Sequence, residues 1–308
     1  MQEYIDLGKQ IYDMNNPREV RRMVTFVIRA VLNNSKMQEL LSFFRTKTLL
    51  QQMIESNPFP IEQVTRAFFY KGASFKERSQ LIREHYQYFS NSLTDDVFLR
   101  LSCPKLCQGG LELWSMEFEE GKRLKAVLSF EGGQRKEGLL SIIIKLEDIS
   151  FYQIIFWAAK DKNGKDAIWI GAMQGPNVED AKEAIKRVTK FCHGYRTKNL
   201  SLYVLQAFAR ALEFEKIYAV TNEGYYANNH VRVDRKLKTS FSDFWAEAGG
   251  TPTDDSRFYS LPLIEARKTM EEVPTRKRAV YRRRFVLLDE IDEIVADNVK
   301  KVLRDAAI

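Results

Sequence analysis

The hydrophobic pattern of this 308-residue chain changes near residue 110, and no other feature constrains the fold as strongly. Before that point apolar residues recur at the three- and four-residue spacing of helices, and after it short apolar runs alternate with turn residues. Helical and strand patterns in separate stretches of one chain are typical of an α+β fold. We therefore predict an all-helical domain over residues 1–105, followed by a domain over residues 106–308 in which helices flank a mixed, mostly antiparallel sheet.

Capping residues predict where two helices of the first part begin. Residues 16–19 (Asn-Pro-Arg-Glu) place a capping Asn before Pro and an acid in the first turn. Residues 74–77 (Ser-Phe-Lys-Glu) form a capping box, which begins a helix that continues to about residue 90. Apolar spacing predicts further helices at 36–54 and 61–69.

Short apolar runs in the second part predict a strand meander that leads into a helical crossover. The crossover consists of a helix at 178–191, a polar loop at 193–199 and a helix at 200–214. A connection of this kind implies at least one parallel strand pair. The expected strands are residues 124–130, 139–146, 151–159, 168–173, 217–221 and 258–263.

Charge and cysteine content narrow the class of protein. The 48 Lys and Arg residues exceed the 41 Asp and Glu residues, giving +7, so a phosphorylated ligand, an anionic membrane or nucleic acid is admissible as a partner. Three cysteines (Cys103, Cys107 and Cys192) without a CxxC spacing support neither a disulfide framework nor a zinc site. The sequence shows neither a signal-peptide pattern nor an apolar stretch of roughly 18 residues. We therefore expect a cytoplasmic protein, either free or peripheral to the inner membrane.

A cationic run near the C-terminus predicts an anion-binding surface. Its cations are Arg276, Lys277, Arg278, Arg282, Arg283 and Arg284. Such a run can bind anionic lipid, or nucleic acid phosphates without sequence specificity, since no recognition motif is present. The alternative is a solvated helix face, in which the cations pair with the acids that follow them: Asp289, Glu290, Asp292 and Glu293.

Four phrases in the second part carry a family resemblance. They are His193-Gly-Tyr-Arg-Thr-Lys-Asn199, Thr221-Asn-Glu-Gly-Tyr-Tyr-Ala-Asn-Asn-His230, Phe244-Trp-Ala-Glu-Ala-Gly-Gly250 and Arg257-Phe-Tyr-Ser-Leu-Pro-Leu263. With them, the stretch from about residue 69 to 288 resembles the VirK/YbjX family of Gram-negative bacteria, the DUF535 group. The resemblance implies a role in virulence, envelope integrity and resistance to antimicrobial peptides, in some members at a membrane. It implies no catalytic residues.

The loop at 193–199 suits a phosphate, because a helix N-terminus offers unpaired N–H groups and cations stand beside it. It resembles the pyrophosphate loop of GNAT-type acetyltransferases, although Asn199 and Ser201 stand where that pattern has glycines. The resemblance implies a GNAT-like sheet and a phosphopantetheine donor, either acyl-CoA or acyl carrier protein, with no required cofactor. Arg196, Lys198 and Asn199 are the expected phosphate ligands. The alternative is an ordinary helix capped by Thr197 or Asn199.

Two further positions complete the acyltransferase hypothesis. Gln174 ends a predicted strand, whose free edge can bind the amides of an acyl chain by strand addition. The alternative is that Gly175-Pro176 only terminates the strand and binds nothing. Polar residues after the strand at 217–221 are expected to face a crevice. In the hypothesis Glu223 or His193 is the base, and Tyr225 or Tyr226 protonates the leaving thiolate. Asn229 and His230 belong to the same polar segment, for which a hydrogen-bonded turn is the alternative.

The remaining histidine, His85, does not indicate a metal site. His85 is expected to be a packed or surface residue, because no second metal-type residue follows at helical spacing. A non-enzymatic scaffold, which docks on a membrane or a partner protein through the cationic run, is the competing hypothesis for the function.

Overall fold

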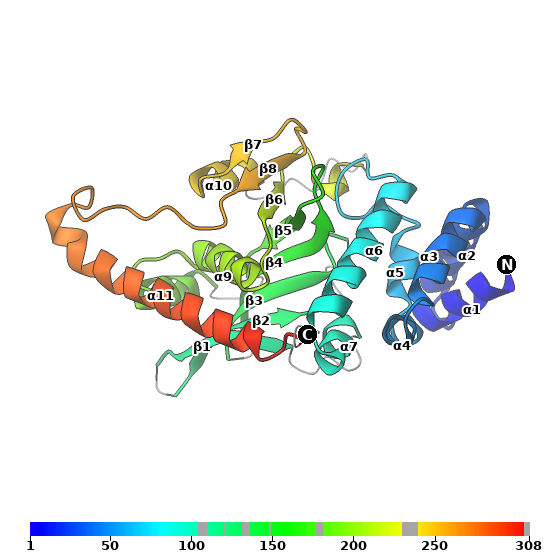
Figure 1. Cartoon of the computed structure of the whole chain (residues 1–308), viewed down its shortest axis with the longest axis horizontal. Helices are drawn as coiled ribbons and strands as arrows, with labels where there is room; N and C mark the ends of the chain where they lie inside the picture. Colours follow the sequence, from blue (N-terminus) through cyan, green and yellow to red (C-terminus); the bar gives the residue numbers. More distant parts are fainter. Residues whose placement is uncertain are drawn as a thin grey trace.

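The computed structural model describes residues 1–103, 110–119, 121–130, 136–147, 149–176, 181–229 and 240–304. A group of helices precedes an eight-stranded mixed sheet, and further helices cover that sheet (Figure 1). This confirms the predicted α+β class. The predicted domain boundary near residue 105 lies outside the described residues.

The helices of the first part begin where the capping residues predict. The Asn16 side chain accepts the N–H of Arg18, and Ser74 and Glu77 form both hydrogen bonds of a capping box. The helices are α1 (Gln2–Ile11), α2 (Pro17–Leu32), α3 (Asn34–Phe44), α4 (Thr48–Ser56), α5 (Phe59–Gln63), α6 (Phe75–Ser92) and α7 (Asp95–Ser102).

Two predicted helices differ from the structure. The segment 36–54 is divided between α3 and α4, and the prediction of a helix over 61–69 is wrong beyond Gln63. Phe69 instead adopts a positive φ of 68°. Its N–H bonds the carbonyl of Lys136, and its ring packs 4.8 Å from that of Trp157. Packing onto the sheet therefore overrides the local helical pattern.

The sheet has the order β1-β2-β3-β4-β5-β6-β8-β7. The pair β5–β6 is parallel and the other neighbours are antiparallel, as the predicted crossover requires. β1 and β7 were not expected from the sequence. The strands are β1 (Leu111–Glu117), β2 (Arg123–Ser129), β3 (Leu140–Leu146), β4 (Ile149–Lys160), β5 (Asp166–Gln174), β6 (Lys216–Val220), β7 (Thr251–Pro252) and β8 (Phe258–Leu261).

Helices cover both faces of the sheet (Figure 1). Phe156 of β4 packs against Phe208 of α9, whereas the next residue, Trp157, packs against Phe69 on the opposite face. α11 lies along α9, and α6 packs on β4. The helices of this part are α8 (Ala181–Phe191), α9 (Thr197–Ala211), α10 (Phe241–Glu247) and α11 (Arg278–Lys300), with the short 3₁₀ helices η2 (Tyr226–Asn229) and η3 (Thr275–Lys277).

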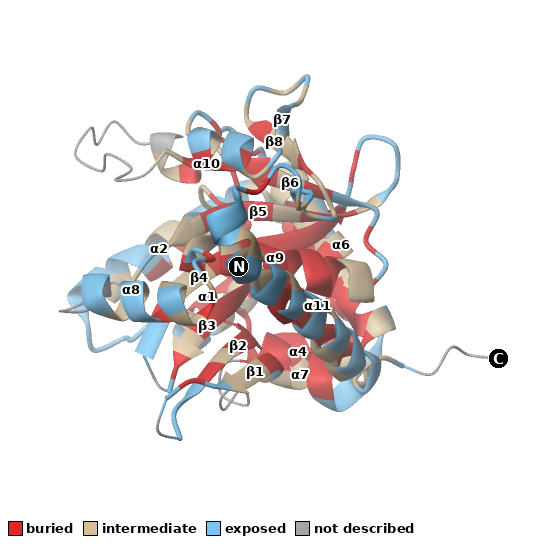
Figure 2. Cartoon of the chain, turned by 90° about the vertical axis from the view of Figure 1, so that its left-hand side faces the viewer, coloured by how far each residue is buried: buried red, intermediate tan, exposed pale blue. Residues whose placement is uncertain are grey.

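One hydrophobic core joins the first helices, the sheet and α11. It extends from Phe26 of α2 through Phe156 of β4 to Ile291 of α11. Figure 2 shows buried residues concentrated in the strands and exposed ones on the outer sides of α8 and α11. In the part of the chain that the structure describes, no helix has the length and apolar character to cross a bilayer.

Candidate functional site

A cavity of about 720 Å³ lies where the start of α9 meets the first turns of α11. It joins two segments that the sequence marks separately, the loop at 193–199 and the cationic run at 276–284. We call it the anion pocket. Its lining residues are Gly194, Tyr195, Arg196, Asn199, Glu247, Glu265, Lys268, Lys277, Val280, Tyr281 and Arg284.

Arg284 holds the loop that leads into α9. Its Nε and Nη2 atoms donate to the carbonyl oxygen of His193, at 3.2 and 2.9 Å, and its guanidinium lies 4.3 Å from the centre of the Tyr281 ring. His193 and Gly194 both have a positive φ, 52° and 74°. A Cβ atom at Gly194 would lie 3.1 Å from Arg284 Nη2, so glycine suits this position both in conformation and in space.

The N-terminus of α9 has no side-chain cap. Arg196 occupies the capping position without a side-chain hydrogen bond, and the first N–H groups of a helix have no acceptor within the helix. The prediction that Thr197 or Asn199 caps this helix is therefore wrong. Thr197 Oγ1 and Asn199 Oδ1 are buried and have no hydrogen-bond partner among the described residues. The positive end of α9 lies at the pocket, where Arg196 and Asn199 are lining residues.

The two predicted cations at the start of α9 both contact α10. Arg196 forms an ion pair of 3.2 Å with Glu247, in which both side chains are more than half exposed. Lys198 Nζ lies 4.0 Å from the centre of the Phe244 ring. Burial lowers the pKa of Lys198, and the charge of Arg196 lowers it further. Arg196 therefore lines the anion pocket, while Lys198 packs on α10.

Sequence reasoning assigned no role to several lining residues, among them Tyr195, Glu265 and Lys268. The Tyr195 hydroxyl donates to the Glu265 carboxylate. Burial raises the pKa of Glu265, although the hydrogen bond from Tyr195 and the charges of Arg267 and Arg284 oppose this shift. Glu265 and Lys268 lie between β8 and α11 in a segment with no periodic pattern, so no sequence signal marked them.

A second cluster forms at the end of the parallel strand pair. The Tyr225 hydroxyl donates to Glu137 Oε1 at 3.1 Å, and the rings of Tyr225 and Tyr226 lie 5.0 Å apart. Glu137 is only 5% exposed, and burial raises its pKa although both tyrosines hydrogen-bond it. We call these three residues the tyrosine–glutamate cluster. A buried carboxyl with a raised pKa is a suitable acid–base group.

The other predicted acid–base residues lie apart from this cluster. Glu223 is exposed, and His193 belongs to the loop at the anion pocket, where partial burial and the charges of Arg283 and Arg284 lower its pKa. Asn229 ends η2, and His230 lies outside the described residues.

Gln174 lies at the end of β5, and helix α10 contacts residues of both regions. β6 pairs with β5 only as far as Ile170, so residues 171–174, including Gln174, extend beyond the parallel pair. α10 contacts both regions, because its Phe244 lies against Lys198 and its Phe241 ring lies 5.7 Å from that of Tyr225.

The cationic run divides into fixed and exposed residues. Arg278 Nε donates to the carbonyl of Val273, and Arg284 is fixed as described above. The exposed members are Arg276, Lys277, Arg282 and Arg283.

The predicted pairing of the run with the acids of the same helix is wrong for two of these acids. Asp289 pairs with Arg267 at 2.6 Å, and Asp292 pairs with Arg210 of α9. Among the described residues, no group of three His, Cys, Asp or Glu side chains could hold a metal ion.

The chain is similar to known proteins over most of its length. The "Uncharacterized protein YbjX" of Escherichia coli (strain K12) is 32% identical over 235 residues, which are 75% of this chain and 69% of that protein. "Membrane protein LapB" of Mannheimia haemolytica is 24% identical over 196 residues, 63% of this chain and 80% of that protein. No solved structure matches.

A family model described as "Protein of unknown function (DUF535)" matches residues 15–297. This match covers far more than half of the chain and agrees with the resemblance carried by the four sequence phrases. The chain belongs to the DUF535 family, the VirK/YbjX group.

Proposed function

We propose that the protein is an acyltransferase whose anion pocket binds the phosphates of a phosphopantetheine donor, coenzyme A or acyl carrier protein. The proposal rests on the start of α9, which has no side-chain cap and lies beside the pocket residues Arg196 and Asn199. Four cations line the same cavity: Arg196, Lys268, Lys277 and Arg284. Helix N-terminal N–H groups and flanking cations together favour phosphate.

The tyrosine–glutamate cluster supplies the proton transfers in this proposal. An amine or hydroxyl of the acceptor attacks the thioester carbonyl and loses its proton to the Glu137 carboxylate. The carbon–sulfur bond breaks, and the leaving thiolate takes the hydroxyl proton of Tyr225. Glu137 then returns a proton to Tyr225 through their 3.1 Å hydrogen bond, which restores both groups. Glu137 replaces Glu223 and His193 as the proposed base because it alone of the three is buried against a tyrosine hydroxyl.

Calorimetric titration tests the donor site. The double variant Lys268→Ala/Lys277→Ala removes two exposed cations from the pocket and should weaken coenzyme A binding at least roughly tenfold, at about 1 kcal/mol for each phosphate contact. The matched control is Arg282→Ala/Arg283→Ala, which removes the same charge from exposed positions outside the lining. Absence of coenzyme A and holo acyl carrier protein binding, or equal weakening by both variants, contradicts the proposal.

A second candidate function, binding to an anionic membrane surface, is favoured by the first turns of α11. Arg282 and Arg283 are exposed there, and the neighbouring Val280 and Val286 are 41% and 56% exposed. Cations beside exposed apolar side chains suit a lipid headgroup region. The name of the Mannheimia relative, "Membrane protein LapB", agrees with this candidate, as do the envelope roles that the family resemblance implies.

Vesicle sedimentation tests the membrane candidate. Each cation near an anionic surface contributes about 1 kcal/mol, so Arg282→Ala/Arg283→Ala should weaken binding to phosphatidylglycerol vesicles by about 30-fold. Phosphatidylcholine vesicles are the control. Unchanged sedimentation of this variant would exclude the helix as the membrane-binding surface.

A further inference from the structure

A second large cavity, of about 620 Å³, lies on the face of the sheet that α6 packs against. Its floor is a row of aromatic side chains from three adjacent strands, Trp157, Trp169 and Tyr218, which are direct cross-strand neighbours. Tyr70 and Phe258 add two further rings to its wall. We call this cavity the aromatic pocket. It shares no lining residue with the anion pocket or with the tyrosine–glutamate cluster.

The aromatic row is closely packed and rigid. The rings of Trp157 and Trp169 are 6.3 Å apart and inclined by 7°, and those of Trp169 and Tyr218 are 4.3 Å apart and inclined by 24°. Trp157 is fully buried, yet its indole N–H has no acceptor among the described residues. This N–H is a donor, so an acceptor on the ligand or a water would satisfy it, whereas an ammonium or guanidinium group would not.

Three carboxylates of the lining lack a cationic partner. Glu77, Glu84 and Asp161 form no ion pair with Lys or Arg in the described ranges. They accept hydrogen bonds instead: Glu77 from the Tyr70 hydroxyl, Asp161 from the Tyr218 hydroxyl, and Glu84 from the backbone N–H of Lys160.

The hydrogen bonds keep two of these carboxylates ionised at neutral pH. Burial alone would raise the pKa of Asp161, but the N–H groups of Lys165 and Asn163 outweigh it and lower that pKa. In Glu77 the hydrogen bonds from Ser74 and Tyr70 similarly outweigh burial and lower the pKa. The charge of Arg257 also lowers the pKa of Glu77, although the two side chains form no ion pair.

The cations of the lining are already neutralised. Lys160 pairs with Asp166 at 2.9 Å, Lys162 pairs with Asp254, and Arg257 pairs with Asp255 at 2.7 Å. Five carboxylates and three cations line the pocket, so its lining has a net negative formal charge.

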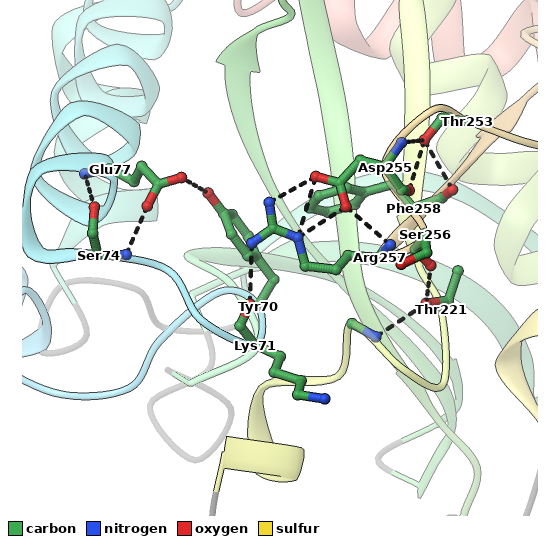
Figure 3. Close-up of polar contacts among 11 residues, drawn as sticks. Tyr70, Lys71, Ser74, Glu77, Thr221, Thr253, Asp255, Ser256, Arg257 and Phe258 are labelled. Carbon is green, nitrogen blue, oxygen red and sulfur yellow. Dashed lines mark hydrogen bonds and ion pairs between the residues drawn. The ribbon is translucent and has the colours of Figure 1, made fainter.

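One of these cations, Arg257, already lies against an aromatic ring of the pocket wall. The guanidinium of Arg257 lies 4.7 Å from the centre of the Tyr70 ring, whose hydroxyl bonds Glu77 (Figure 3). A cation held against an aromatic ring beside carboxylates is a favourable arrangement.

We propose that the aromatic pocket binds a small organic cation, an ammonium or guanidinium group joined to an apolar or aromatic group. The charged group is held by Glu77, Glu84 and Asp161, and the apolar part contacts the aromatic row. This site stands whether or not the protein transfers acyl groups.

Three isosteric probes test the proposal on the full-length protein. Benzamidine is a cation, benzamide is neutral and benzoate is an anion, while their size and ring are nearly the same. Calorimetric titration should show benzamidine binding at least roughly tenfold more tightly than benzamide, and benzoate binding least. Trp157 and Trp169 should report the same event as a change in tryptophan fluorescence.

Charge-removing variants locate the binding. Glu84→Gln and Asp161→Asn keep a side-chain oxygen for the existing hydrogen bonds, and each should weaken benzamidine binding about fivefold. Glu290→Gln, an exposed change on α11, is the matched control. Raising the salt concentration should weaken the binding of benzamidine to the wild-type protein, because salt screens the attraction between opposite charges. Equal affinity for the three probes, tighter binding of benzoate, or binding that neither variant nor salt alters overturns the proposal.

Discussion

At the scale of single residues, His85 of α6 shows how burial determines the state of a titratable group. It is fully buried, and its Nδ1 accepts the backbone N–H of Ala158 in β4 at 3.1 Å. Burial lowers its pKa to about 3. The ring is therefore neutral in the folded protein at neutral pH, and of the two expected places, packed or at the surface, His85 takes the packed one.

The neutral state of His85 predicts a dependence of stability on pH. In the unfolded chain His85 binds a proton below about pH 6.5, but in the folded protein only below about pH 3. Its contribution to the free energy of unfolding is thus complete above pH 6.5 and falls by roughly 1.4 kcal/mol per unit as the pH drops toward 3. Urea titrations between pH 7 and 4 should show a smaller pH dependence for His85→Gln than for the wild type. If the free energy of unfolding depended on pH equally in both proteins, His85 would bind its proton as readily in the folded protein as in the unfolded chain, which would contradict the lowered pKa.

Gly171 of β5 predicts a second effect at the residue scale. A Cβ atom there would overlap the carbonyl oxygen of Glu137, so Gly171→Ala must displace Glu137 or β5. We expect the free energy of unfolding to fall by about 2–4 kcal/mol, mainly because the backbone must move to make room for the added Cβ atom. The matched control is Gly175→Ala, whose Cβ would meet the Tyr152 ring at an ordinary 3.5 Å. Equal melting temperatures for the two variants would contradict this account of Gly171.

At the scale of elements, local chemistry determines where many helices and strands begin. The capping residues at 16–19 and 74–77 act within one turn, and both of these helices start as predicted. The central strands β3 and β4 are buried on both faces, so continuous apolar runs bounded by turn residues reveal them. The helix expected over 61–69 does not form past Gln63, because Phe69 binds to residues far along the chain. Such contacts leave no periodic signal.

The packing of α11 on α9 predicts which of its residues stabilise the fold. Ile291 is fully buried, whereas the adjacent Glu290 is exposed and has no ion pair within the described ranges. Ile291→Ala should lower the free energy of unfolding by about 2–5 kcal/mol, through lost burial and the cavity left behind. Glu290→Ala should change it by less than about 0.5 kcal/mol. Chemical denaturation of both variants checks the difference, and a small effect of Ile291→Ala would mean that α11 is not docked in solution.

At the scale of the whole molecule, the candidate sites are assembled from segments that are distant in sequence. The anion pocket joins the loop at 193–199 to residues 265–284, and the tyrosine–glutamate cluster joins residue 137 to 225 and 226. The sequence indicated the loop, the cationic run and the two tyrosines as separate features. It could not indicate Glu137 or Glu265, because an isolated acid becomes functional only through the burial and the partners that folding supplies.

The central claim, that the start of α9 binds the phosphates of an acyl donor, is tested most directly by hydrogen–deuterium exchange with and without coenzyme A. The first N–H groups of α9 have no acceptor in the helix and no side-chain cap, so they should exchange rapidly in the free protein. A bound phosphate accepts these hydrogen bonds, and we predict slower exchange in peptides that cover residues 194–200. Unchanged exchange in these peptides at a saturating coenzyme A concentration, or protection confined to other regions, would contradict the account.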